Sequence, residues 1–270
     1  MAGAARESNS GGTYADRVDA DRPVTPPVVV LTVWGISPRL VPAAIARMGL
    51  DRWHLRNRPG LRFAKLLGTG SGQTFTLRDA DPLHWALLTI WDDDPAADRF
   101  AASTTHRRWN AMSDERLEVR MSPLASRGRW AGEEPFTPSA ARPGRTDVGP
   151  VASITRARIR PTRALSFWRA VPAVSADLTT VAGLALAIGI GEAPIGLQGT
   201  FSLWQSNAAL NNFAHRRPAH AEVVRRTGPE RWYAEELFAR FVVRSIIGTF
   251  AGREPLADAP ADSGCPSERS

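Results

Sequence analysis

The chain has 270 residues, of which 43% are hydrophobic, enough for one large domain or two small ones with an apolar core. Its net charge is +7, but the arginines are spread along the chain beside acidic residues, which argues against a nucleic-acid-binding protein. The only cysteine, Cys265, excludes a disulfide framework and a thiolate metal centre. The longest apolar run, 181–190, is about half the length of a membrane span. Because residues 1–27 are polar, we expect no signal peptide and a cytoplasmic location.

Composition divides the chain into two modules flanked by polar segments. Residues 1–27 and 252–270 are rich in Gly, Ser, Asp and Arg, and we predict that both are disordered tails. Residues 132–150 hold four prolines and few apolar residues, which is typical of a linker. We therefore predict a first module over 28–131 and a second module, with the candidate cofactor site, over 151–251.

The predicted elements follow the same order in both modules. The β-branched run 28–34 indicates a buried strand, and Pro38 begins a predicted helix that ends before Gly49. The rest of the first module is predicted as strands at 61–67, 83–91 and 117–121 and a helix at 94–109. The second module is predicted as strands at 151–159, 181–188, 199–204 and 241–250, a helix at 161–173, and two or three helical pieces within 206–240.

This order, βαββαβ twice, is that of the ferredoxin-like unit. Residues 60–64 parallel 183–187, and Trp91 and Phe100 have the same spacing as Trp204 and Phe213, which supports a duplication. Each unit leaves one apolar sheet face bare, so two units can pack these faces together. We predict an α+β protein in which two ferredoxin-like βαββαβ repeats pack as a single unit like a dimeric α+β barrel, with an interior that could hold a ligand.

Histidines are the main candidates for chemistry. The chain has five: His54, His84, His106, His215 and His220. None forms an HExxH motif, and the chain has no Gly-x-Ser-x-Gly elbow, so metal-dependent hydrolysis and serine hydrolysis of these types are disfavoured. His106, at a place in the first module close to that of His220 in the second, is expected to be exposed.

His220 is the most informative histidine. Pro218 suits the first position of a helix, because its missing N–H would be unpaired there in any case. His220 would then share an apolar helix face with Val223 and Val224. An imidazole on such a face suits an axial ligand of a buried macrocycle. It is also typical of a core histidine bonded to a backbone carbonyl, which is the commoner case, and the pattern alone leaves both interpretations open.

Two segments resemble a known family. Residues 63–76, FAKLLGTGSGQTFT, are similar to the F-x-K-L-x-G-T-G-x-G-x-x-F-T stretch of the spheroidene monooxygenase family. Residues 213–227, FAHRRPAHAEVVRRT, and 232–241, WYAEELFARF, resemble its second signature. The similarity extends over roughly 28–252.

The resemblance implies a heme-containing oxygenase that oxidises an acyclic carotenoid from a methylene to a ketone. It implies heme b as cofactor, with His220 as the axial iron ligand; His215 lies close by, so the choice between these two histidines stays open. Arg217 is also assigned to cofactor binding. Arginines of the segment 225–241 could pair with cofactor carboxylates, or form ion pairs with Glu235 and Glu236 on a helix face. Lys65, within the first motif, is interpreted either as lining the cavity or as a surface lysine at a strand end.

The implied partners are a hydrophobic small-molecule substrate, dioxygen and an electron donor such as a ferredoxin, with no nucleic acid. Peripheral contact with an anionic membrane surface is a further expectation, from the basic charge. Two alternatives stay open: a heme-dependent lyase similar to aldoxime dehydratase, and a non-catalytic protein that binds apolar ligands.

Overall fold

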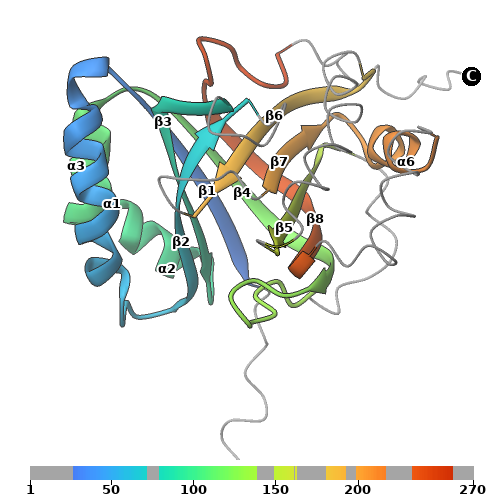
Figure 1. Cartoon of the computed structure of the whole chain (residues 1–270), viewed down its shortest axis with the longest axis horizontal. Helices are drawn as coiled ribbons and strands as arrows, with labels where there is room; N and C mark the ends of the chain where they lie inside the picture. The colour runs from blue at the N-terminus through green and yellow to red at the C-terminus, as the bar shows by residue number, and fades with distance from the viewer. Residues whose placement is uncertain are drawn as a thin grey trace, which may run out of the picture.

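The computed structural model describes residues 27–71, 79–138, 149–160, 162, 181–192, 199–216 and 233–257. Within these ranges, eight antiparallel strands close into one barrel in the order β1-β3-β2-β6-β7-β5-β8-β4 (Figure 1). No helix in the described ranges combines the length and the apolar character that a membrane crossing needs.

Within the described ranges the strands occur in the predicted order, while the helix predicted at 161–173 lies almost entirely outside the described residues. The first module contains β1 (Val28–Ile36), a 3-10 turn η2 (Pro38–Leu40), α1 (Val41–Leu55), β2 (Leu61–Gly70), β3 (Ala80–Trp91), α2 (Asp94–Ala101), α3 (Thr104–Met112) and β4 (Ser113–Gly128). The second contains β5 (Val151–Ile159), β6 (Leu184–Gly191), β7 (Gly199–Trp204), α6 (Asn207–Arg216) and β8 (Tyr233–Gly248).

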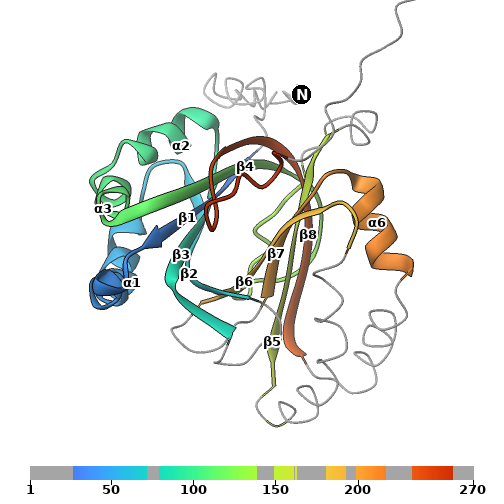
Figure 2. The same ribbon diagram turned by 90° about the horizontal axis from the view of Figure 1, so that it is seen from above.

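The two modules meet along two seams. Strand β2 pairs with β6 on one side of the barrel, and β4 pairs with β8 on the other. Helices α1, α2 and α3 cover the outside of the first module, and α6 lies on the opposite side of the barrel, against the second module (Figures 1 and 2). The predicted fold class, two ferredoxin-like repeats packed as an α+β barrel, is therefore confirmed.

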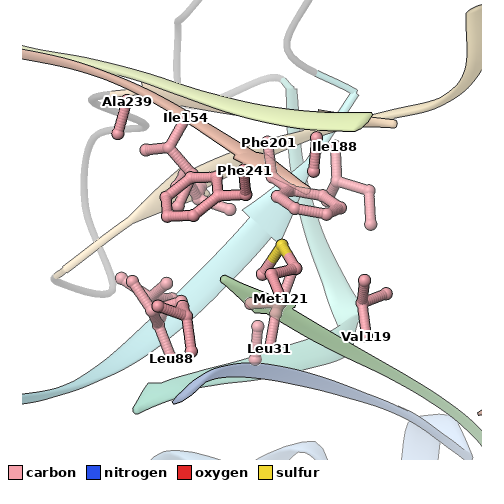
Figure 3. Packing of buried hydrophobic residues seen from close by; sticks show 14 of the residues in the cluster. Leu31, Leu88, Val119, Met121, Ile154, Ile188, Phe201, Ala239 and Phe241 are labelled. Carbon is pink, nitrogen blue, oxygen red and sulfur yellow. The ribbon is translucent and has the colours of Figure 1, made fainter. Parts of the chain in front are cut away.

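Apolar side chains from both modules fill the centre of the barrel. Figure 3 shows Leu31 and Met121 of the first module facing Phe201 and Phe241 of the second. All four side chains are at most 1% exposed and belong to one continuous cluster, which includes residues from all eight strands. Because this cluster occupies the middle of the barrel, the candidate site must be sought on another face.

Matching contacts support the predicted duplication. The rings of Trp91 and Phe100 lie 5.1 Å apart at 34°, and those of Trp204 and Phe213 lie 5.2 Å apart at 34°. Gly60 and Gly183 both have positive φ, and an added Cβ would lie 2.7 and 2.6 Å from an alanine Cβ of the following helix. Glycine is therefore required at both places, because any side chain would collide with that helix.

Two predicted elements differ from the structure. The helix expected at 94–109 is two helices, because Ser103 adopts an extended conformation and its Oγ accepts a hydrogen bond from His106 N at 3.3 Å, which caps α3. The segment 233–240, expected to be helical, is the first half of strand β8. Its composition favours a helix, but Leu237 and Ala239 alternate into the barrel core and β8 pairs with both β4 and β5.

A glutamate from each module holds a turn of the other module. Glu115, in β4, accepts hydrogen bonds from the backbone N–H groups of Ala251 and Gly252, and Glu235, in β8, accepts them from Ala131 and Gly132. These bonds outweigh the effect of burial, so the pKa of each glutamate lies below its usual value. The carboxylates therefore stay ionised and tie the two modules together.

Candidate functional site

The residues assigned to the cofactor lie mostly outside the described part of the chain. His220 and Arg217 fall within the range 217–232, which the structure does not describe. His215 belongs to helix α6, but its side chain is likewise outside the described set. The site must therefore be built from the elements around this range, which are α6 before it and β8 after it.

Helix α6 is fixed on the outer face of the second module by a few contacts. Ser206 Oγ accepts a hydrogen bond from Ala209 N at 3.2 Å in the first turn. Leu210 and Phe213 then pack with Trp204 and Val151 of the sheet. This small apolar cluster covers only one end of the face.

The outer faces of the two modules can be compared position by position, because their strand registers correspond. Val28 pairs with Trp91 in the first module, and Val151 pairs with Trp204 in the second. Counting along the paired strands gives these counterparts, with the first-module residue first: Val30 and Ser153, Trp34 and Ala157, Leu66 and Gly189, Leu87 and Thr200. All four first-module side chains are buried beneath the helices.

We call Ser153, Ala157, Gly189 and Thr200 the small-residue face. In the first module these positions hold a tryptophan, two leucines and a valine, which fill the layer between sheet and helices. At these four positions the second module has only small side chains. Protein interiors are close-packed, so the volume given up by the sheet has to be taken by other atoms. A large, flat, apolar group lying on the sheet would fit such a face.

His106, in helix α3 of the first module, is buried against the sheet. It was expected to be exposed, but it is 3% exposed and its ring meets the Trp34 ring edge-on at 5.4 Å. Burial lowers the pKa of His106, so the imidazole is neutral at neutral pH. The expectation of exposure was wrong because α3 turns this face inward onto the sheet.

Hydroxyl groups form a short chain on the small-residue face. Trp204 Nε1 donates to Ser202 Oγ at 2.9 Å, and Ser202 Oγ lies 2.8 Å from Ser153 Oγ. In the first module the equivalent bond, from Trp91 to Thr89 at 2.8 Å, is buried beside Val30. The second module thus replaces an apolar contact with a polar group at the edge of the face.

Four charged side chains point into one end of the barrel: Lys65, Arg156, Glu192 and Glu235. Arg156, 4% exposed, donates to Glu192 at 2.6 Å and to Glu235 at 2.7 Å. Lys65 Nζ lies 3.1 Å from Glu192, and the guanidinium of Arg156 lies 5.0 Å from the centre of the Trp130 ring. Burial would raise the pKa of Glu192, but the neighbouring Lys65 and Arg156 charges hold it below its usual value.

The sequence interpretation identified only part of this charged cluster. Lys65 does point inward, as one of the two interpretations required, but it faces a carboxylate. Arg156 and Glu192 were not singled out, although the sequence carries a signal for Arg156. In β5 the inward positions are 152, 154 and 156, and an arginine continues the apolar alternation of Ala152 and Ile154.

Comparison with known proteins adds to this geometry. A crystal structure of aldoxime dehydratase superposes with a TM-score of 0.52 at 12% identity, covering 82% of each chain. A second aldoxime dehydratase structure, in complex with butyraldoxime, gives a TM-score of 0.50 at 12% identity, covering 82% of this chain and 81% of the other. At this identity the likeness shows the fold alone.

Sequence relatives are much closer. The chain is 37% identical over 218 residues to spheroidene monooxygenase of Rhodobacter capsulatus, covering 80% of this chain and 90% of that protein. It is 36% identical over 253 residues to spheroidene monooxygenase of Rubrivivax gelatinosus, covering 90% and 93%. The enzyme of that name from Cereibacter sphaeroides is 34% identical over 217 residues, covering 80% and 66%. No protein-family model matches the chain.

The barrel of paired ferredoxin-like modules places the protein among the α+β-barrel proteins that share the aldoxime dehydratase fold. Within that class, sequence identity to known proteins identifies the family. The chain belongs to the spheroidene monooxygenase family. It is therefore an oxidoreductase of the monooxygenase type, which uses oxygen to oxidise a small molecule.

Proposed function

We propose that the protein is a heme-dependent monooxygenase that binds heme b on the small-residue face and oxidises a hydrophobic substrate. The observation that carries this proposal is the loss of Trp34, Leu66, Leu87 and Val30 at their second-module counterparts. Small residues there make room for a macrocycle between the sheet and its covering segments. Family membership supplies the monooxygenase chemistry.

His220 is proposed as the axial ligand, with His215 as the alternative. The support comes from the first module, where His106 lies on the inner face of α3 and touches Trp34. The second module has Ala157 at the counterpart of Trp34, so a histidine directed at this part of the sheet would face a position without a large side chain. A neutral imidazole is the form that binds iron.

The bound heme would supply oxygen activation, and the chain supplies the surroundings. The small-residue face would orient the macrocycle, and the buried cluster around Trp204 would exclude water from one edge. Ser153 offers a hydroxyl at the same face. The substrate is proposed to be spheroidene or a related acyclic carotenoid, as the relatives' name suggests. Oxidation from methylene to ketone and a ferredoxin-type electron donor are proposed from the family resemblance.

The proposal is tested by an absorption spectrum and a pyridine hemochrome assay on protein expressed with heme supply. About one heme b per chain, with oxidation of an acyclic carotenoid by dioxygen that requires reduced ferredoxin as electron donor, is the expected result. Anaerobic turnover of an aldoxime would favour the lyase alternative. A colourless protein that still binds a polyene would favour a carrier.

Ala157→Trp restores the side chain that the first module has at this position. We expect heme occupancy to fall by roughly 10-fold or more, because an indole on the face competes for the volume of the macrocycle. Thr155→Val, on the same strand and face, is the matched control. Heme content per folded chain is the measurement; equal occupancy in both variants would contradict the assigned face.

Contact with a membrane is proposed through the outer face of α1. Three large apolar side chains lie exposed there: Ile45 at 50%, Leu50 at 61% and Trp53 at 70%. The only acid of the helix, Asp51, is 1% exposed and accepts a hydrogen bond from Trp109. Arg56 lies 4.4 Å from the centre of the Trp53 ring, and Arg52 is exposed beside it.

Exposed tryptophan and leucine flanked by arginines suit the headgroup region of an anionic bilayer. A second copy of the chain suits this face less well, because a two-fold contact would bring like charges together. Helix α1 lies on the opposite side of the barrel from α6, so this contact does not involve the proposed cofactor face (Figures 1 and 2).

Arg52→Gln/Arg56→Gln is expected to weaken binding to phosphatidylglycerol-containing vesicles by about 5-fold for each arginine removed. Leu50→Gln/Trp53→Gln should reduce binding by roughly 10-fold or more, because the apolar anchor is lost. Ile247→Gln, a change of an exposed side chain on β8, is the control and should bind normally. Vesicle flotation measures the bound fraction; self-association that depends on Trp53 would instead identify a dimer contact.

A further inference from the structure

Arg240 stands beside the small-residue face on strand β8. It pairs in register with Ser153, which pairs in turn with Ser202 on β7, so the three residues form a row across the outer face of the sheet. Arg240 Nη1 donates a hydrogen bond to Asn211 Oδ1 of helix α6 at 2.6 Å. The guanidinium is therefore held between the sheet and the helix, at the edge of the proposed cofactor site.

The first module has an arginine at the same place. Arg120 pairs in register with Val30, the counterpart of Ser153, and is surrounded by three acids. Its nitrogens lie 2.7 Å from Asp98, 3.0 Å from Glu118 and 3.8 Å from Asp94. Here the arginine is a structural group whose charge is balanced within the module.

In the second module the arginine is kept and all three acids are replaced. Asn207 and Asn211 follow Trp204 at the spacings at which Asp94 and Asp98 follow Trp91. Phe238 precedes Arg240 by two residues, as Glu118 precedes Arg120. The positive charge is therefore retained where its three partners have become two amides and a phenyl ring.

A buried polar atom of Asn207 also indicates a ligand near Arg240. The Oδ1 atom of Asn207 is buried without a hydrogen-bond partner, the one such side-chain atom found in the described ranges. A buried polar atom without a partner is costly, so a group absent from the structure is expected near it. An amide can present its oxygen or its NH2 group by rotating, so it can accept from or donate to such a group.

We infer that Arg240, assisted by Asn211 and Asn207, is a carboxylate-binding site that anchors a propionate of the heme. This inference rests on the proposed function. Among the described residues, Asn211 is the hydrogen-bond partner of the guanidinium, and a guanidinium has further donors that can bind a carboxylate. A ligand carboxylate would restore the charge balance that Asp98 and its neighbours give Arg120.

The test compares heme b with its dimethyl ester, in which both carboxylates are blocked, on the full chain reconstituted from its heme-free form. Arg240→Gln should weaken heme b binding by roughly 10- to 100-fold and leave ester binding unchanged. Asn211→Asp restores the acid of the first module and should weaken heme b binding as well, because Arg240 then has an internal partner. Arg240→Lys keeps the charge, so its affinity for heme b should lie between that of the unmodified chain and that of Arg240→Gln.

The outcomes separate this inference from the proposed function. Arg240 is not a carboxylate anchor if Arg240→Gln and Asn211→Asp bind heme b as tightly as the unmodified chain does. The same holds if these variants lose affinity for the dimethyl ester as much as for heme b. In both cases the proposal of heme binding itself stands. If the unmodified chain binds neither form, the proposed function fails and this site with it. Circular dichroism and the melting temperature of each variant establish that it is folded.

Discussion

His220→Ala is expected to yield folded protein without stoichiometric heme. An axial ligand provides the one covalent link between chain and iron, and without it the macrocycle is held by packing and carboxylate contacts alone. We expect the pyridine hemochrome assay to give well under half a heme per chain. The melting temperature of the heme-free form establishes that the variant is folded.

His215→Ala is the matched variant, since the two histidines are close in sequence and both are assigned to cofactor binding. If His220 is the ligand, His215→Ala keeps its heme and its spectrum. The reverse pattern would transfer the role to His215. Full heme content with an unshifted spectrum in both variants would remove both histidines from the axial position.

Arg156→Met is expected to lower the free energy of unfolding by roughly 2–4 kcal/mol. Arg156 is the buried cation that joins Glu192 and Glu235, at 2.6 and 2.7 Å, and its loss leaves two carboxylates facing one another at the barrel end. For a domain of this size, that corresponds to a fall of roughly 5–15 °C in melting temperature. Thermal unfolding followed by circular dichroism is the measurement.

Arg127→Met provides the control for this change. The Arg127 side chain is 80% exposed and lies 4.0 Å from Glu236, so its pair is screened by water and contributes no more than roughly 0.5 kcal/mol. Equal melting temperatures for the two variants would show that the charged cluster at the barrel end adds nothing to stability. A double variant, Arg156→Met with Glu192→Gln, should recover part of the loss by removing one of the two carboxylates that face each other without Arg156.

Local patterns predicted most of the barrel. The β-branched run at Val28 and the proline at Pro38 indicated where the first strand and the first helical segment begin, because these signals act within a few residues. The matched Trp91–Phe100 and Trp204–Phe213 pairs indicated the duplication, and the structure gives them the same ring geometry. The family motifs came from the same linear information.

Strand β8 shows where local patterns fail. Residues 233–240 have a helix-favouring composition, yet they form a strand because β4 and β5 offer hydrogen-bond partners on both sides. His106 is a second case, since its neighbours in sequence are polar while α3 turns it onto Trp34. Both outcomes depend on elements distant in the chain.

By itself, the sequence determined the order of elements, the repetition of the module and the family, because each is written in residues near one another. Only the tertiary structure decided which face of the second module lost its large side chains, that Arg156 bridges two glutamates, and that Arg240 kept its charge without the acids of Arg120. The physical reason is register: these relations join strands and helices far apart in the chain, and they become visible only when the barrel closes.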